Sequence, residues 1–156
     1  MARFDQSPFA KFQLEGLDAT KTLNRICAND VDVEIGRVVY TQWLNDRGGI
    51  EADLTVTRVA ENLFLIVTSA ESEVRDYHWL RKHIPKDAHC VLTNVTSGFG
   101  VISIMGPRSR DLLQSLTPDQ LSHTSFPFAT SREIELGLGY ARASRISFVG
   151  ELGWEL

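Results

Sequence analysis

Residues 38–59, VVYTQWLNDRGGIEADLTVTRV, contain two strand-like runs separated by a turn signal. Residues 38–44 and 50–59 are rich in β-branched and aromatic side chains, which favour strands. The five residues between the runs end in a glycine pair, and glycine readily takes the positive φ that tight hairpin turns need. The stretch therefore predicts an antiparallel hairpin.

Further strand-like and helix-like runs flank this hairpin on both sides. Strands are expected over residues 9–14, 63–68, 90–95, 101–105, 131–136 and 142–148, and from 154 onward. Helices are expected after a capping Asp18, over residues 72–83, and after Gly106-Pro107, because proline fits a first helical turn. A strand, a glycine and a helix recur around Gly16 and Gly106. This pattern predicts an α+β fold of mainly antiparallel sheets with helices packed on one face.

Composition excludes several classes of protein. The chain of 156 residues is 43% hydrophobic and 23% charged, which is typical of a globular domain. A net charge of -4 argues against nucleic acid as a partner, because affinity there comes mainly from neutralising phosphates. No apolar run approaches the length of a membrane span, and the first residues lack a signal or targeting peptide. We expect a cytoplasmic protein, or a mitochondrial matrix protein if the source is eukaryotic.

The last seven residues, 150–156, form an apolar, strand-like stretch rather than the polar end typical of a terminus. We therefore expect residues 1–156 to be part of one domain that is incomplete at its C-terminus. Such a fragment would leave a sheet edge open, and a homo-oligomer could cover that edge.

Other residues that often carry chemistry lack the required pattern here. His78, His83 and His89 are five and six residues apart, which does not place pairs on one helical face, so no metal site is expected. Cys27 and Cys90 form no CxxC pair and are expected to be reduced core residues. The two GxG segments lack the third glycine of a dinucleotide fingerprint and are interpreted as turns.

The carboxylates are better candidates for functional-site residues than the histidines, cysteines and glycines. Alternation places Asp53 with Glu51, Thr55 and Thr57 on one strand face, opposite Ala52, Leu54 and Val56. Spacing alone favours an ordinary solvated face, but Tyr40 and Trp43 on the preceding strand could bring an aromatic wall to Asp53. Glu151 follows a glycine and is equally consistent with an ordinary turn. A carboxylate can also accept two parallel N–H groups, the edge that an aminopyrimidine presents.

Several segments resemble the aminomethyltransferase (glycine-cleavage T-protein) family in order along the chain. They are GGIEADL at residues 48–54, LFLIVTSA at 63–70, VISIMGP at 101–107 and GELGWE at 150–155. FDQSPFAKF at residues 4–12 and FVGELGWEL at 148–156 look most like the folate half of dimethylglycine and sarcosine dehydrogenases. The resemblance implies a tetrahydrofolate-binding domain that forms 5,10-methylenetetrahydrofolate from an amine-derived one-carbon unit.

The resemblance also implies roles for individual residues. Asp53 matches the catalytic aspartate, which orients the folate and stabilises charge around its reacting nitrogens. Tyr40 matches a position that packs on the folate, Val67 one whose backbone contacts the pterin, and Glu151 the carboxylate at the pterin edge. FAD would belong only to a fused or partner amine dehydrogenase domain, because no flavin-binding sequence occurs in this chain.

Two departures from the family pattern concern the C-terminal end. Phe148-Val149 stands where T-proteins commonly have Tyr-Thr, and the arginine that meets the folate tail and the C-terminal barrel would lie beyond Leu156. Two alternatives therefore stay open. One is a non-catalytic folate-binding or assembly protein on the same scaffold, although the Cys and Gln of that branch are absent around Gly150. The other is an inactive truncated fragment.

Overall fold

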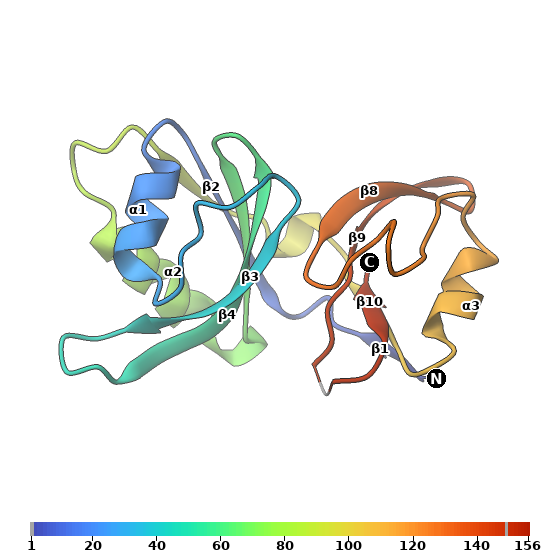
Figure 1. Cartoon of the computed structure of the whole chain (residues 1–156). Helices are drawn as coiled ribbons and strands as arrows, with labels where there is room; N and C mark the ends of the chain where they lie inside the picture. Colours follow the sequence, from blue (N-terminus) through green and yellow to red (C-terminus); the bar gives the residue numbers. More distant parts are fainter. Residues whose placement is uncertain (1, 149) are drawn as a thin grey trace. The chain divides into compact units, whose positions relative to one another are not determined.

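The computed structural model describes residues 2–148 and 150–156, and its contacts divide the chain into two compact units. Unit 2 is the continuous segment Pro8–Phe99, whereas unit 1 combines the residues up to Ser7 with Gly100–Leu156. Each unit contains one five-stranded antiparallel sheet with helices beside it (Figure 1). The predicted α+β class with mainly antiparallel sheets is confirmed.

Unit 2 contains the hairpin that was predicted for residues 38–59. Its elements are β2 (Ala10–Glu15), α1 (Ala19–Ile26), β3 (Val38–Leu44), β4 (Ile50–Ala60), β5 (Leu63–Thr68), α2 (Glu73–His83) and β6 (Val91–Asn94), with short 3₁₀ turns at Ala70–Ser72 and Thr96–Gly98. The strands follow the order β3-β4-β5-β2-β6, and every neighbouring pair is antiparallel. The predicted strands at residues 38–44 and 63–68 match the observed bounds.

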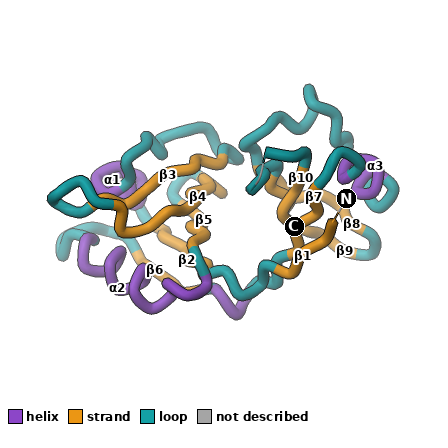
Figure 2. The backbone as a smooth tube through the Cα atoms, turned by 90° about the horizontal axis from the view of Figure 1, so that it is seen from below, coloured by secondary structure: helices purple, strands orange, loops and turns teal. Residues whose placement is uncertain are grey.

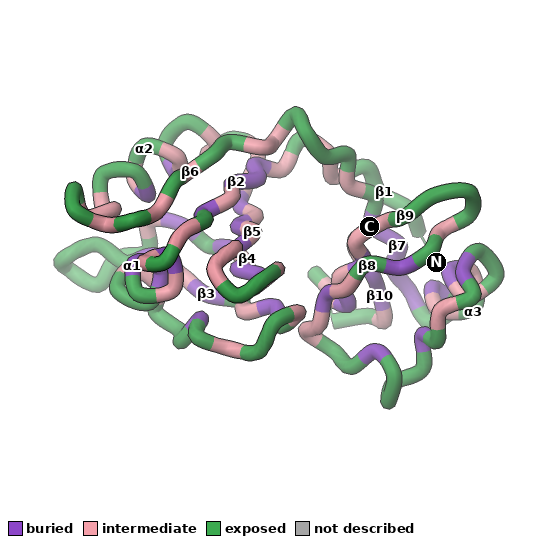
Figure 3. The backbone as a smooth tube through the Cα atoms, turned by 90° about the horizontal axis from the view of Figure 1, so that it is seen from above, coloured by how far each residue is buried: buried purple, intermediate pink, exposed green. Residues whose placement is uncertain are grey.

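Helices α1 and α2 lie on the same side of the unit 2 strands (Figure 2), and alternate strand residues on that side form the hydrophobic core. Phe12, Leu54 and Ile66 from three strands pack with Leu23 of α1 and Leu80 of α2, and all five are buried. Figure 3 shows buried stretches along the strands and helices of this unit. Both helices thus cover the same face, as predicted for this sheet. The opposite face carries both polar and apolar side chains, among them Gln42, Asp53 and Val67.

Two of the contacts between helix α2 and the sheet involve large or charged side chains. The indole of Trp79 stacks on Trp43 of β3, with ring centroids 4.9 Å apart and planes 9° apart. The buried carboxylate of Asp76 accepts hydrogen bonds from the Thr68 hydroxyl at 2.7 Å and the Arg75 guanidinium at 2.9 Å. Pairing of the buried carboxylate removes the penalty of leaving a charge unsatisfied next to the core.

Unit 1 joins the start of the chain to its last third. Its elements are β1 (Ala2–Asp5), β7 (Ile102–Met105), α3 (Ser109–Gln114), β8 (Ser131–Leu136), β9 (Gly139–Ser144) and β10 (Gly153–Glu155), in the strand order β1-β7-β10-β9-β8. Trp154, Ile104 and Leu113 lie in the core on the α3 side, and Phe126 meets Trp154 edge-on at 6.4 Å. The helix again covers one face of its sheet.

The structure differs from the prediction mainly at three places. Strand β1 was not predicted, because its four residues are all exposed and show no alternation. The prediction of a strand at 142–148 is wrong in its bounds, because Gly137, at φ +60, reverses the chain early and β9 begins at Gly139. Asp18 occupies the N-cap position of α1, but its side chain makes no cap hydrogen bond; its carboxylate instead accepts the His89 amide N–H at 2.7 Å.

The helices in the described ranges are too short or too polar to cross a bilayer. Cys27 and Cys90 are free and half-buried, as expected, and burial raises the pKa of Cys27 to about 11. The Cys27 thiol is therefore protonated and unreactive at neutral pH. No group of three His, Cys, Asp or Glu side chains suited to a metal occurs within the part of the chain that the structure describes.

Gly16, between β2 and α1, has φ +140, and a Cβ atom there would overlap the His89 carbonyl oxygen. We expect Gly16→Ala to lower the free energy of unfolding by about 2–4 kcal/mol, because it adds both backbone strain and a backbone clash. Urea unfolding followed by tryptophan fluorescence measures this. Gly139→Ala is the matched control: it has open space and no positive φ, so an equal loss there would contradict the explanation.

Candidate functional site

Asp53 lies in the middle of β4, and β3 supplies hydrogen-bond donors to both of its carboxylate oxygens. Gln42 is its direct cross-strand neighbour, and Tyr40 is the diagonal neighbour two residues earlier. The Tyr40 hydroxyl donates to Oδ2 at 2.9 Å, and the Gln42 amide donates to Oδ1 at 3.1 Å. The carboxylate is therefore held in one orientation on an exposed sheet face.

The turn between β3 and β4 sets this arrangement. The Asn45 Oδ1 atom accepts the backbone N–H groups of Arg47 and Gly49, both at 2.9 Å, and the Asn45 Nδ2 atom donates to Glu51 at 2.9 Å. Gly48 takes φ +77, so one member of the predicted glycine pair adopts the positive φ. A turn fixed by side-chain bonds fixes the pairing of the strands that follow it.

The hydrogen bond to the Asp53 carboxylate raises the pKa of Tyr40 above its usual value. The phenol therefore stays a donor at neutral pH, and the Asp53 carboxylate accepts its hydrogen bond. A fixed, ionised carboxylate can stabilise positive charge that develops on a nearby ligand nitrogen. The lone pairs that Tyr40 and Gln42 do not use remain available for that role.

Val67 shares this face. It pairs with Thr55 of β4, and Thr55 in turn pairs with Tyr40 of β3, so the three side chains form one row across the sheet. The structure thus brings Tyr40, Asp53 and Val67 to a single surface of unit 2. Trp43 does not belong to it, because it pairs with Ala52 and is buried on the opposite face.

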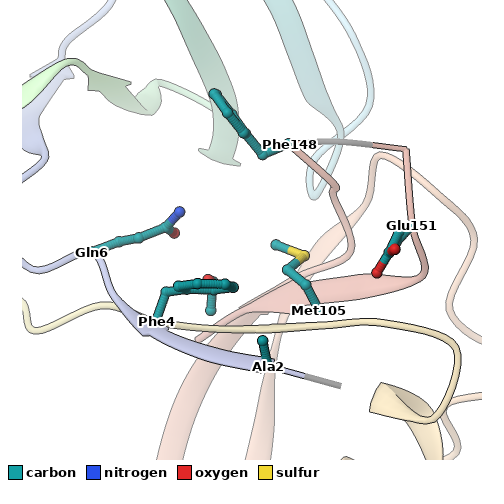
Figure 4. Close-up of a pocket in the computed structure, with 7 residues that line it drawn as sticks. Ala2, Phe4, Gln6, Met105, Phe148 and Glu151 are labelled. Atoms are coloured by element: carbon teal, nitrogen blue, oxygen red, sulfur yellow. The ribbon is translucent and has the colours of Figure 1, made fainter.

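Glu151 belongs to unit 1, where it lines a pocket of about 410 Å³ (Figure 4). The pocket is lined by Ala2, Phe4, Gln6, Ser103, Met105, Phe148 and Glu151. Phe4 and Met105 lie on one side of it, Phe148 lies across from them, and Gln6 and Glu151 lie at its two ends (Figure 4). The lining is mainly apolar, with a few polar groups, which is typical of sites for small molecules.

The Glu151 carboxylate is exposed and makes no hydrogen bond to any residue in the described ranges. It is therefore free to accept N–H groups from a ligand in the pocket. Phe148, at which the sequence departs from the Tyr of T-proteins, is 84% exposed and offers a ring face instead of a hydroxyl. Val149, the second departure, lies outside the described residues.

Sequence reasoning did not single out Gln42 or the apolar pocket walls. The position of Gln42 could have been predicted, because a hairpin with its turn at residues 45–49 places Gln42 close to Asp53 on the same face of the sheet. The place of Phe4 and Met105 in the pocket could not have been predicted, because it depends on the pairing of β1 with β7, which are separated by about one hundred residues. Long-range pairing of this kind leaves no local pattern.

Comparison with known proteins gives a match over the whole chain. The family model described as GCVT N-terminal domain matches residues 1–156. A 4-methylaminobutanoate oxidase (formaldehyde-forming) from Paenarthrobacter nicotinovorans is 40% identical over 98% of this chain. The mitochondrial sarcosine dehydrogenase of Homo sapiens is 38% identical over 99% of it. This chain covers 18% of the length of each of these two relatives.

A solved structure shows the same fold. The glycine cleavage system aminomethyltransferase T from Bartonella henselae superposes with a TM-score of 0.82 and 26% identity. The match covers 98% of this chain and 40% of that protein. The resemblance found in the sequence motifs is therefore confirmed at the level of family and fold.

Replacing Asp53 should be visible in the titration of Tyr40. We expect Asp53→Asn to lower the pKa of Tyr40 toward its usual value, because the charged acceptor that favours the protonated phenol is lost. Ultraviolet titration measures phenolate formation, and Tyr40→Phe identifies the Tyr40 signal among the three tyrosines. Asp46→Asn, in the same hairpin turn, is the control; an unchanged Tyr40 titration in Asp53→Asn would refute the hydrogen bond.

Proposed function

The chain belongs to the GCVT N-terminal domain family, and on that premise we propose that it is the tetrahydrofolate-binding part of a one-carbon-transfer enzyme. The family includes aminomethyltransferases, and its longer relatives oxidise N-methyl amines. The observation that carries the proposal is the unit 1 pocket, which combines aromatic walls with the unpaired carboxylate of Glu151. Its volume of about 410 Å³ is within the range of small-molecule sites.

The pocket suits a pterin ring. Phe4 and Phe148 offer apolar ring faces, and stacking on such faces favours a flat heteroaromatic ligand. Glu151 can accept the two parallel N–H groups of an aminopyrimidine edge, and paired hydrogen bonds to a carboxylate are stronger than neutral ones. No Lys or Arg is among the seven lining residues, so the pocket favours a ring with N–H donors over an anion.

Asp53 has the chemical role in this proposal. When bound, tetrahydrofolate supplies the nitrogens that take up the one-carbon unit. Asp53, held by Tyr40 and Gln42, stabilises positive charge at those nitrogens or accepts a proton from them. Tyr40 offers an exposed ring beside Asp53, and Val67 lies on the same face of the unit 2 sheet. The product is 5,10-methylenetetrahydrofolate, and the one-carbon donor is an N-methyl amine.

A flavin-containing amine dehydrogenase domain is the proposed partner. The 4-methylaminobutanoate oxidase and the sarcosine dehydrogenase that this chain matches are each more than five times its length. Such a domain would oxidise the N-methyl amine and deliver the one-carbon unit. The FAD belongs to that domain and not to this chain.

Binding is tested by calorimetric titration of the chain with tetrahydrofolate. We expect saturable binding that weakens by about tenfold or more in Glu151→Gln, because a charge-assisted pair of hydrogen bonds is lost. Glu135→Gln, an exposed carboxylate on β8, is the control and should bind like the unaltered chain. A folded sample that shows no saturable binding would overturn the proposal.

Chemistry is tested separately from binding. In the presence of an N-methyl amine and its flavin-containing dehydrogenase, we expect Asp53→Asn to keep tetrahydrofolate binding and to lower 5,10-methylenetetrahydrofolate formation by roughly a hundredfold. Asp46→Asn should leave both unchanged. Equal losses of binding and product formation would show that Asp53 acts in binding alone.

A further inference from the structure

Gln42 and Asp53 face each other at a narrow position of the β3–β4 ladder. The Gln42 carbonyl oxygen accepts the Ala28 N–H at 2.9 Å on the outer side of β3, so the backbone polar groups of Gln42 point away from β4. In an antiparallel ladder such a pair makes no backbone hydrogen bonds, and its Cα atoms are only about 4.5 Å apart. The backbone itself therefore brings these two side chains close together.

This narrow pairing lets the Gln42 amide reach the carboxylate oxygen that Tyr40 leaves open. The Gln42 Nε2 atom donates to Asp53 Oδ1 at 3.1 Å, whereas the Tyr40 hydroxyl donates to Oδ2 at 2.9 Å. The last side-chain torsion of an aspartate is broadly distributed, so a carboxylate with one hydrogen bond can pivot about the bonded oxygen. A second donor on the other oxygen fixes the plane of the group. Gln42 thus sets an orientation that Tyr40 alone would leave variable.

The outer edge of β3 is clamped by the segment that follows α1. The Asn29 side-chain amide donates to the Tyr40 carbonyl oxygen at 2.6 Å, and the Asn29 N–H donates to the buried Thr41 hydroxyl at 3.0 Å. An edge strand otherwise has unpaired backbone groups on its free side. Here β3 is held by β4 on one side and by residues 28–29 on the other. The strand that supplies both donors to Asp53 is therefore a fixed support.

Both of these donors are neutral. No ion pair includes Asp53 within residues 2–148 and 150–156. A Lys or Arg partner would also orient the carboxylate, but its charge would oppose the attraction between the carboxylate and a positively charged ligand nitrogen. An amide and a phenol hold the group without that opposing charge. The arrangement suits a carboxylate whose direction matters and whose charge is directed at a ligand.

We propose that Gln42 is a positioning residue of the one-carbon transfer, whose amide fixes the plane in which the Asp53 carboxylate faces the ligand nitrogens. The inference rests on the proposed function, in which Asp53 acts on those nitrogens. Gln42 acts through Asp53 and does not itself bind the folate. Its contribution is to the rate of transfer, because a catalytic group misplaced by about 1 Å can lower a rate by about a hundredfold.

The test replaces Gln42 in the full chain, supplied with an N-methyl amine and its flavin-containing dehydrogenase. Gln42→Met keeps the length of the side chain and removes the donor, and Gln42→Glu replaces the donor with an acceptor beside Asp53. We expect calorimetric titration to give a Kd for tetrahydrofolate within about twofold of the unaltered chain. We expect the kcat for 5,10-methylenetetrahydrofolate formation to fall about tenfold in Gln42→Met and further in Gln42→Glu.

Two comparisons distinguish positioning from a general structural role. In an Asp53→Ala background, Gln42→Met should have no further effect on kcat, because no carboxylate remains for the amide to orient. Gln13→Met is the matched control, because Gln13 is a half-buried glutamine of β2 on the same face of the sheet, three strands from β3. It should leave both the Kd and the kcat unchanged.

The outcomes separate this inference from the proposed function. An unaltered chain that neither binds tetrahydrofolate nor forms product would overturn both. Product formation by the unaltered chain, with the same kcat in Gln42→Met, would overturn the positioning role alone. An affinity loss as large as the loss of kcat would make Gln42 a binding residue, and a full further loss in the Asp53→Ala background would make its effect independent of Asp53. Either result would also overturn the positioning role.

Discussion

The register of β3 against β4 is the constraint on which unit 2 depends. Side chains alternate between the faces of a strand, so a slip by one residue would turn Asp53 into the core and Ala52 toward solvent. The hydrogen bonds of Asn45 oppose that slip, because they fix the length and geometry of the turn. The same pairing that buries Leu54 and Val56 against the helices thereby aligns Gln42 with the Asp53 carboxylate.

Unit 1 shows a contrasting use of the two faces of a sheet. On the α3 side, Trp154 and Ile104 are buried in a packed core. On the other side, Ser103 lines the pocket that contains Glu151 at one end, and its hydroxyl has no hydrogen-bond partner among the described residues. A face that is fully satisfied in the free state would have little hydrogen-bonding capacity left for a ligand.

Much of this could be predicted from the sequence, because strands and turns depend on nearby residues. The hairpin, the α+β class and the placement of Asp53 beside an aromatic residue followed from alternation and from the glycine pair. Gln42 was not predicted as a site residue, because the partner of an exposed glutamine can be identified only when the register of β3 against β4 is known. Ser103 was not predicted either, because its place in the pocket wall depends on the pairing of β1 with β7, which are distant in sequence. The roles of Asp53 and Glu151 came from family resemblance and stay predictions.

The composition of unit 1 has a consequence for the order in which the chain folds. Unit 2 is one continuous segment, Pro8–Phe99, so all its strands are available as soon as that segment has left the ribosome. Strand β1 is synthesised first but pairs with β7, whose residues follow about one hundred positions later. Contacts of such high sequence separation form slowly, and β1 must wait unpaired while unit 2 is completed. Strand β1, which precedes unit 2 in the sequence, therefore enters its sheet only after the strands of unit 2 have been synthesised.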